Sequence, residues 1–495
     1  MTSPNTKRIV IIGGGPAGYE AALVAATRGA EVTVVDPDGM GGACVLLDCV
    51  PSKTFIASTG VRTELRRASG LGFDIGIEDA KITLGQINNR VKTLARSQSA
   101  DIASQLLHEK VNIVGGRAEL IDAVPGMAHH RVRVTTLAGQ EGVLKADVVL
   151  IATGARPRVL PGAVPDGERI LNWRQLYDLT DLPEHLVIVG SGVTGAEMCN
   201  AYTELGVRVT VVASRDQILP HEDRDAAALL EDVFAERGVA LVKHGRCDSV
   251  TRTDTGVTVN LADGRTVEGS HALMTVGSVP NTADLGLERV GVDLGPGDYI
   301  PVDRVSRTSA AGIYAAGDCT GLLPLASVAA MQGRIAMYHA LGEGVSPIRL
   351  RTVASATFTR PEIAAVGVPQ SAIDDGTVPA RTIMLPLTTN ARAKMSDVED
   401  GFVKLFCRPA SGLVVGGVVV APRASELIVP IALAVVIGLL TLPRGPDTPL
   451  STRAVRAAPA RHVTSLRVPS HCLAVHRGAR GARPRPRARP RRPRR

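Results

Sequence analysis

The sequence predicts an α/β protein with two doubly wound parallel sheets, followed by a C-terminal α+β domain. At residues 8–36 and again at 185–212, a continuous apolar strand leads into a glycine-rich loop, a helix and a second strand. Strands that are apolar throughout are typical of parallel sheets buried on both faces. Residues 401–406 and 413–420 instead read as neighbouring strands of an antiparallel domain. A length of 495 residues suits about three domains.

Composition indicates a globular protein with an ample core, because 45% of the residues are apolar and 21% are charged. The seven cysteines are scattered, except for Cys44 and Cys49. The opening residues lack the long apolar stretch and cleavage site of a secretion signal. We therefore expect a cytoplasmic protein with one special cysteine pair and no secreted disulfide framework.

The net charge of +8 is unevenly distributed. Residues 436–495 contain 15 arginines, no lysine and one acid, Asp447, so this segment carries +14 and residues 1–435 carry −6. The apolar run at 427–442 is interrupted by Pro430 and is too short for a membrane span. We expect no membrane span and regard nucleic acid as an unlikely partner of the mildly acidic body.

The first glycine loop, GGGPAG at residues 13–18, follows the strand at 8–12 and opens a helix. In this motif Gly13 makes the tight turn, Gly15 lets the backbone approach a pyrophosphate, and Gly18 lets helix and strand pack closely. The helix N-terminus, with Pro16 and Ala17, then favours the anion. Asp36 ends the next strand and can hold the hydroxyls of an adenosine ribose. The loop predicts a Rossmann-like dinucleotide site.

The second loop, GSGVTG at residues 190–195, repeats the pattern. Its members are Gly190, Gly192, Val193, Thr194 and Gly195. Where the first unit has Asp36, this one has Ala213, followed by Ser214 and Arg215. No acid repels the 2′-phosphate of NADP there, and Arg215 can pair with it, unless Arg215 is an idle surface residue. The loop predicts NADPH or NADH as its ligand.

Cys44 and Cys49 stand five residues apart in the segment GGACVLLDCVPSK, residues 41–53. At a helix start, the dipole and nearby Lys53 would lower a thiolate pKa, which suits redox exchange through a small disulfide ring. The alternative is a pair of small buried apolar side chains that never bond. Spacing does not choose between them.

This segment and both glycine loops resemble the pyridine nucleotide-disulfide oxidoreductases, which include dihydrolipoamide dehydrogenase. Further matches follow in family order over residues 8–435: ATGARP at 152–157, VGSVPN at 276–281, Gly317-Asp318 with Leu325-Ala326, and TRPEIAAVG at 359–367. The resemblance implies an FAD-binding domain at 1–157 and 282–348, an NAD(P)-binding domain at 158–281, and a dimerisation domain at 349–435.

The resemblance also implies site residues. Catalysis would involve Cys44, Cys49, Lys53 and Glu197, with Lys53 and Glu197 paired beside the flavin. Metal ligands are not expected. Besides the loop residues above, cofactor binding would use Gly42, Ala43, Lys53, Ala118, Thr153, Gly154, Gly277, Asp318 and Ala326.

The sequence departs from the family at its base and beside its second cysteine. Family disulfide reductases end in a His-Pro motif followed by Glu, which acts as acid–base for the dithiol across the dimer. Here His462, His471 and His476 do not precede proline, and no Glu follows Glu426. Asp48 stands where Gly is usual and would raise a thiolate pKa. The amino-acid sequence of residues 48–57 and 211–214 most resembles that of the NAD(P)H–quinone reductase subgroup of this family.

Three interpretations of the function follow. The first is an FAD-dependent NAD(P)H–quinone reductase, which needs no C-terminal base because the flavin carries the chemistry. The second is a dihydrolipoamide dehydrogenase with a Cys44–Cys49 redox disulfide and lipoamide as substrate. The third is a flavin-loaded subunit disabled by its C-terminus. A homodimer is expected in each case.

The tail at 436–495 has two interpretations. One is an arginine-rich arm for anionic surfaces. The other, which we favour, is out-of-frame translation of a G+C-rich gene, since such frames yield Arg, Pro, Ala and Gly but little Lys. The segment would then be disordered and the dimer weakened.

Overall fold

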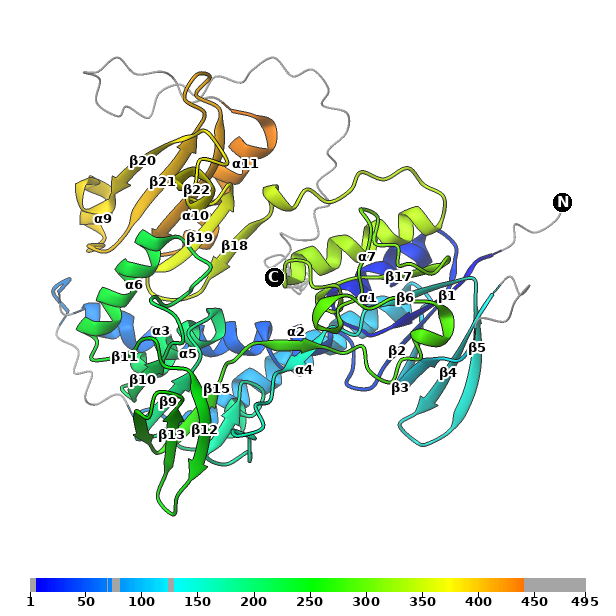
Figure 1. The fold of residues 1–495 in the computed structure, drawn as a ribbon, viewed down its shortest axis with the longest axis horizontal. Coiled ribbons are helices and arrows are strands. Elements are labelled where there is room, and N and C mark those ends of the chain that lie inside the picture. Colours follow the sequence, from blue (N-terminus) through cyan, green and yellow to red (C-terminus); the bar gives the residue numbers. More distant parts are fainter. Residues whose placement is uncertain (1–5, 69, 74–80, 123–128, 440–495) are drawn as a thin grey trace, which may run out of the picture.

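The computed structural model describes residues 6–68, 70–73, 81–122 and 129–439. It forms three lobes built around three large sheets (Figure 1). The expected disorder of the arginine-rich tail concerns residues that lie, apart from 436–439, outside the described residues.

The first sheet has seven strands. In spatial order they are β17 (Ile313–Ala315), β6 (Val148–Ile151), β1 (Arg8–Ile12), β2 (Glu31–Asp36), β3 (Asn112–Leu120), β4 (His130–Thr136) and β5 (Glu141–Ala146). Pairing is parallel from β17 to β3 and antiparallel from β3 to β5. Because β17 pairs with β6, the chain returns to this sheet after building the second one.

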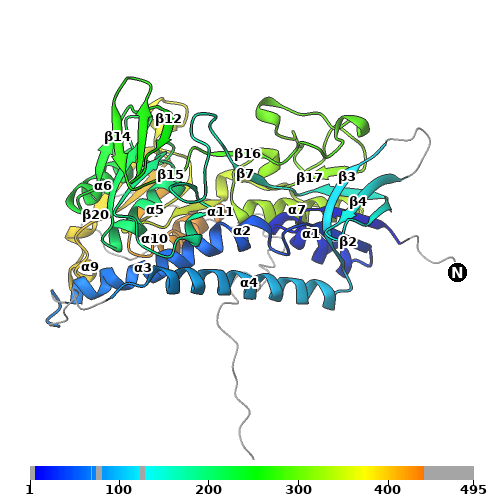
Figure 2. The ribbon, with the colours of Figure 1, turned by 90° about the horizontal axis from the view of Figure 1, so that it is seen from below.

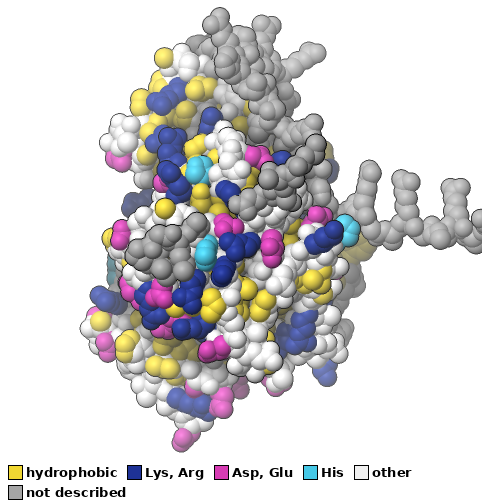
Figure 3. All heavy atoms as spheres, turned by 90° about the vertical axis from the view of Figure 1, so that its right-hand side faces the viewer, with side chains coloured by type: hydrophobic (Ala, Val, Ile, Leu, Met, Phe, Trp, Pro, Cys, Tyr) yellow, Lys and Arg dark blue, Asp and Glu magenta, His cyan; other side chains and the backbone are white. Residues whose placement is uncertain are grey.

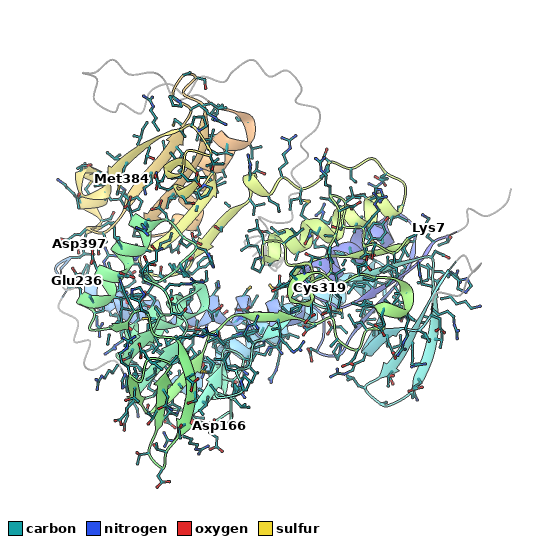
Figure 4. The ribbon with its side chains drawn as sticks, viewed as in Figure 1. Lys7, Asp166, Glu236, Cys319, Met384 and Asp397 are labelled. Carbon is teal, nitrogen blue, oxygen red and sulfur yellow. The ribbon has the colours of Figure 1, made fainter. Side chains whose placement is uncertain are left out.

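Two helices pack together beside the first sheet: α1 (Pro16–Thr27) and α7 (Ala326–Ala340). Gly333 of α7 permits this close approach, since a Cβ there would lie 2.1 Å from the carbonyl oxygen of Ala17. The Lys7 ammonium, labelled in Figure 4, donates to the Ala340 carbonyl at 2.6 Å and fixes the end of α7. The strand and helix residues of this unit form two apolar clusters.

The second sheet has five parallel strands. They are β11 (Ala240–Val242), β10 (Arg208–Val212), β9 (His185–Val189), β15 (His271–Met274) and β8 (Ile170–Asn172). Helices α5 (Val193–Glu204) and α6 (Arg224–Glu236) follow β9 and β10. A small antiparallel sheet, β12 (Cys247–Arg252), β13 (Val257–Leu261) and β14 (Thr266–Gly269), lies beside it. The strands β7 (Ala155–Pro157) and β16 (Ser278–Pro280) pair where the chain passes between the two units.

The C-terminal sheet is antiparallel, as the sequence predicts. Its strands are β18 (Ala354–Thr357), β19 (Glu362–Gly367), β22 (Val414–Ala421), β21 (Phe402–Cys407) and β20 (Arg381–Pro386). The short helices of this lobe are α8 (Ser371–Asp374), α9 (Ala391–Met395), α10 (Ala424–Leu427) and α11 (Val429–Ile437). Asp397 of this lobe, labelled in Figure 4, accepts through its backbone carbonyl from the Arg67 guanidinium at 2.6 Å.

Two long helices connect the lobes along one side of the molecule (Figure 2). They are α3 (Cys49–Ala68), preceded by the short α2 (Gly42–Leu46), and α4 (Leu84–His108). By length and composition the stretch Gly42–Ala68 resembles a membrane span, but 44% of its apolar 18-residue window is buried inside the molecule. It packs against α4 and α5 and contributes Phe55 to the largest apolar cluster. We therefore interpret α3 as a core helix.

The surface of the first lobe mixes both signs of charge. On the face shown in Figure 3, acidic and basic side chains are interspersed among apolar ones. Several are paired, including Arg8 with Asp147 at 2.7 Å and Arg133 with Glu119 at 3.0 Å. Exposed pairs of this kind contribute little to stability.

Candidate functional site

The main cavity of the described chain lies where β1, β2 and α2 meet the connection to the second sheet, and has a volume of about 670 Å³. It collects most residues that the sequence assigned to flavin binding. They are Gly13, Gly15, Pro16, Ala17, Asp36, Gly42, Ala43, Cys44, Cys49, Ala118, Thr153, Gly154, Asp318 and Ala326. These residues are spread over more than 300 positions of the sequence. The last two, Asp318 and Ala326, reach the cavity because β17 and α7 return to the first sheet.

The first glycine loop has the geometry that the motif predicts. Gly13 has φ +111°, and a Cβ there would lie 2.2 Å from the Ala152 carbonyl oxygen. A Cβ on Gly18 would lie 1.9 Å from the carbonyl oxygen of Gly13, so this position needs glycine for helix–strand packing. At Gly15 no atom lies within 4 Å of a Cβ position. This open wall, at the uncapped start of α1, fits a pyrophosphate.

Asp36 stabilises the same loop from the end of β2. Its Oδ2 accepts from the Gly14 N–H at 2.6 Å, and its Oδ1 accepts from the N–H groups of Asp38 and Gly39. Burial raises its pKa, and these three donors oppose that rise. Burial also raises the pKa of Asp318, which lines the same cavity. The cradle and these oxygen acceptors fit the ribose and phosphate parts of a flavin dinucleotide.

The second glycine loop repeats this geometry outside the main cavity. Gly190 has φ +114°, Gly195 packs against the Gly190 carbonyl oxygen at 2.1 Å from its Cβ position, and Gly192 is open. Ala213 is buried, whereas Ser214 and Arg215 are exposed beyond β10. The Gly190 N–H donates to the Val212 carbonyl at 2.9 Å, so the C-terminal end of β10 lies next to the loop. Val193, Thr194 and Gly277 likewise lie outside the main cavity.

Lys53 and Glu197 are paired across 144 positions of sequence. Lys53 Nζ lies 2.8 Å from Glu197 Oε2, and the Glu197 side chain is only 3% exposed. Lys53 belongs to α3 and Glu197 to α5, so the contact of these helices brings them together. Burial lowers the pKa of Lys53, but Glu197, together with Cys49 and Asp48, outweighs this effect and the net pKa is raised. Lys53 therefore remains a cation at neutral pH.

Cys44 and Cys49, which the sequence left open as a bonded or an unbonded pair, are free thiols in this structure. The sequence placed both at the start of one helix, but α2 ends before α3 begins, so Cys44 lies in α2 and Cys49 is the first residue of α3. A hydrogen bond from Cys49 lowers the pKa of Cys44 and raises that of Cys49. The arrangement suits a thiol pair with one more acidic member.

Asp48 lies between the cysteines and lines the same cavity. Burial raises its pKa to about 6, a rise that Lys53 opposes and Glu197 increases. Asp48 in turn raises the pKa of both thiols. The expected effect of a carboxylate at this position is therefore present, and it should fade as the pH falls through the pKa of Asp48.

We expect Asp48→Asn to speed iodoacetamide alkylation of Cys44 at pH 7 about threefold or more, because the carboxylate that raises the pKa of this thiol is removed. Below about pH 6 the wild-type carboxyl is protonated and therefore uncharged, like the amide of the variant, so the two alkylation rates should converge. Mass spectrometry of the reduced enzyme measures the rate. Asp38→Asn, in the same cavity wall, is the control and should behave as wild type; equal acceleration in both variants would contradict the prediction.

Sequence reasoning missed several residues of this cavity. Trp173 and Arg174 line it from the connection after β8, and the Arg174 guanidinium lies 5.0 Å from the Trp173 ring centre. Within the described residues, the buried Arg174 Nε has no hydrogen-bond partner. No motif marks these positions, although Trp173 is the only tryptophan in the chain. Asn281 was seen only as part of a motif; it accepts from Thr153 Oγ1 through its carbonyl at 2.7 Å.

Metal ligation finds no support in the described part of the chain, where no group of three or more His, Cys, Asp or Glu side chains is placed to hold an ion. Nor does the lining of the main cavity, as far as the chain is described, include a histidine.

Comparison with known proteins places this geometry in a family. The family model described as pyridine nucleotide-disulphide oxidoreductase matches residues 7–333, and its dimerisation domain matches residues 353–442. A Mycobacterium tuberculosis protein named NAD(P)H dehydrogenase (quinone) is 72% identical over 431 residues, which cover 86% of this chain and 87% of that protein. A dihydrolipoyl dehydrogenase of Zymomonas mobilis is 31% identical over 85% of this chain and 89% of its own length.

Solved structures of similar proteins have the same fold as this chain. The crystal structure of LpdA from M. tuberculosis is 69% identical and superposes with a TM-score of 0.84, covering 89% of this chain and 97% of that one. The HOCl-induced flavoprotein disulfide reductase RclA of Escherichia coli, at 23% identity and a TM-score of 0.75, covers 86% of this chain and 93% of its own and shares the fold. The chain therefore belongs to the pyridine nucleotide-disulphide oxidoreductase family and is an oxidoreductase that uses FAD and NAD(P)H.

Proposed function

We propose that this enzyme is an NAD(P)H–quinone reductase. The observation that carries the proposal is the 72% identity, over 86% of the chain, to a protein named NAD(P)H dehydrogenase (quinone). The sequence agrees with it, since no His-Pro motif followed by Glu, which would serve a dithiol as base from the partner subunit, occurs after Glu426. The reaction consumes one NAD(P)H, one proton and one quinone, and yields NAD(P)⁺ and the quinol.

Bound FAD would accept the hydride and pass two electrons to the quinone. The chain would hold the cofactors and set their electrostatic environment. Gly13, Gly15 and Gly18 would seat the FAD pyrophosphate on α1, with Asp36 on its ribose and Asp318 in the same cavity. Gly190, Gly192 and Gly195 would do the same for NAD(P)H on α5. Lys53, held by Glu197, would place a positive charge beside the flavin, where negative charge accumulates on reduction.

The second candidate function is dihydrolipoamide dehydrogenase. Two observations favour it: the thiols of Cys44 and Cys49 are hydrogen-bonded, and the pKa of Cys44 is lowered. A relative at 31% identity also carries that name. Against it stands the missing base, whose loss typically costs ~10²–10⁴-fold in rate. The third interpretation, a disabled flavin-binding subunit, would retain FAD without oxidising NAD(P)H.

Steady-state oxidation of NADPH and NADH by the purified holoenzyme, with a naphthoquinone or lipoamide as acceptor, separates the three. We expect turnover with the quinone and little with lipoamide. A Cys44→Ser/Cys49→Ser variant should keep the quinone activity. Turnover with lipoamide that is lost in this variant would instead establish the dithiol enzyme. Bound FAD with no oxidation of either nucleotide would establish the disabled subunit.

Arg215 is proposed to favour NADPH. We expect Arg215→Ala to raise KM for NADPH about tenfold or more, because a charge-assisted bond to phosphate is lost, and to leave KM for NADH unchanged. Arg208→Ala is the matched control, since Arg208 is an exposed arginine at the other end of β10. If Arg215→Ala raises both KM values equally, Arg215 has no part in discriminating the phosphate.

We also propose a cytoplasmic homodimer. The support for a dimer is the dimerisation domain together with an apolar surface on α10 and α11. Its exposed side chains before residue 436 are Leu427, Val429 and Leu433. The tail from 436 onward is proposed to arise from a shifted reading frame. Resequencing the gene tests this origin, and an uninterrupted frame that also occurs in close relatives would overturn it.

A further inference from the structure

One face of α5 holds the segment 358–360, which leads from β18 to β19 of the C-terminal sheet. Glu197 Oε1 accepts from the Phe358 N–H at 3.0 Å, and Asn200 Oδ1 accepts from the Arg360 N–H at 3.0 Å. One turn further along, Glu204 pairs with the Arg360 guanidinium at 3.0 Å. Glu197, Asn200 and Glu204 are all buried. Spacings of three and four residues place them on the same side of the helix.

Glu197 has two partners, one for each carboxylate oxygen. Oε2 receives Lys53 Nζ at 2.8 Å, and Oε1 receives the Phe358 amide at 3.0 Å. A buried carboxylate with both oxygens bonded has little freedom to rotate. The direction in which Glu197 presents Oε2 to Lys53 therefore depends on the backbone of Phe358, which is 161 positions away in the sequence.

Phe358 also contacts the other member of the pair. Lys53 Nζ lies 5.2 Å from the centre of the Phe358 ring, within the range at which an aromatic face attracts a cation. The Lys53 side chain is one-third exposed, so the carboxylate alone does not enclose it. The ring supplies a further favourable contact, and the ammonium is thereby held by Glu197 and Phe358 together.

We propose that Phe358 is a positioning residue of the redox site, and that the C-terminal sheet thereby completes this site within one chain. It acts through Lys53 and Glu197: its amide orients the carboxylate and its ring holds the ammonium. The proposal rests on the location of Lys53 beside the flavin proposed above, but not on the identity of the acceptor. If Lys53 loses this hold, the positive charge moves away from the flavin and the flavin becomes harder to reduce.

The test compares Phe358→Leu, Phe358→Met and Phe358→Tyr holoenzymes. Leucine and methionine keep the amide and an apolar side chain but lose the aromatic face, whereas tyrosine keeps it. We expect Leu and Met to lower the midpoint potential of the bound flavin, to shift its visible absorbance spectrum and to slow its single-turnover reduction by NADH about tenfold, the factor that a partly desolvated cation–π contact supplies. Phe358→Tyr should match wild type in all three readouts.

Arg360→Gln is the matched control, because Arg360 lies in the same segment and pairs with Glu204, which is buried to the same degree as Glu197. It should lower stability towards urea yet leave the flavin spectrum and potential unchanged. Wild-type spectra and potentials in both Phe358→Leu and Phe358→Met would overturn the proposal, as would equal changes in Arg360→Gln. Failure of the quinone assignment would appear separately, in the wild-type enzyme: NADH would reduce the bound flavin, but the quinone would not reoxidise it.

Discussion

Replacing Gly195 by valine is expected to reduce kcat/KM for NAD(P)H at least about a hundredfold, since a displacement of about 1 Å near a bound cofactor costs this much. A Cβ at this position would lie 2.1 Å from the carbonyl oxygen of Gly190 and 3.0 Å from Thr275 Oγ1. Both neighbours belong to the second sheet unit and cannot withdraw easily. The start of α5 must therefore move away from β9, and the pyrophosphate loses its seat.

FAD should stay bound in this variant, because residues 13–18 form the loop between β1 and α1, which is separate from the loop that Gly195 ends. The measurement is steady-state NADH and NADPH oxidation together with the flavin content of the purified protein. Gly142→Ala is the control: Gly142 has no atom within 4 Å of its Cβ position and does not have a positive φ. Gly192→Ala is an intermediate case that should fold normally but weaken binding, since its open Cβ position faces the expected pyrophosphate. Normal NAD(P)H oxidation by Gly195→Val would contradict the assignment of the loop.

Lys404→Met is expected to lower the free energy of unfolding by about 3–5 kcal/mol, the typical result of removing one partner from a buried ion pair. Lys404 lies in β21 and is 1% exposed, and its Nζ lies 2.8 Å from Asp223 Oδ1 and 2.6 Å from Asp225 Oδ2. Asp223 is 3% exposed and caps the N-terminus of α6. Without Lys404 the Asp223 carboxylate would stay buried with no cation beside it.

Urea unfolding of the holoenzyme, followed by circular dichroism, measures this change. Adding Asp223→Ser should recover much of the loss, because serine caps a helix well and removes the stranded charge. Arg224→Met, next in the chain but exposed and paired only loosely with Asp216 at 3.6 Å, should have little effect. If Lys404→Met is no more destabilising than Arg224→Met, the pair does not anchor the C-terminal sheet to α6.

The sequence predicted the position and role of those residues whose function depends on the backbone of one short segment. The turn at Gly13, the open wall at Gly15 and the helix–strand contact at Gly18 all follow from the spacing of glycines. The same reasoning located the second loop and the acid at the end of β2. The resemblance added Lys53 and Glu197, which the structure pairs at 2.8 Å. Their roles beside the flavin remain proposals.

Residues that act through contacts between lobes were not predictable. Phe358 precedes the motif at 359–367 and Lys404 lies in a predicted strand, but neither pattern reveals their contacts, because their partners Glu197 and Asp223 lie 161 and 181 positions away. Trp173 and Arg174 enter the cavity through a loop with no motif. The division of the cysteine segment into α2 and α3 likewise depends on its packing against α4 and α5.

The sequence by itself determined the two dinucleotide loops, the cysteine segment and the family, because glycine spacing and strand periodicity restrict the local backbone directly. The tertiary structure alone decided which distant side chains share the buried carboxylates of α5 and α6. Burial makes an unpaired charge costly, so each of these carboxylates required a partner. The packing of the C-terminal sheet determined that the Phe358 amide would bond Glu197 beside Lys53, and that the Lys404 ammonium would pair with Asp223.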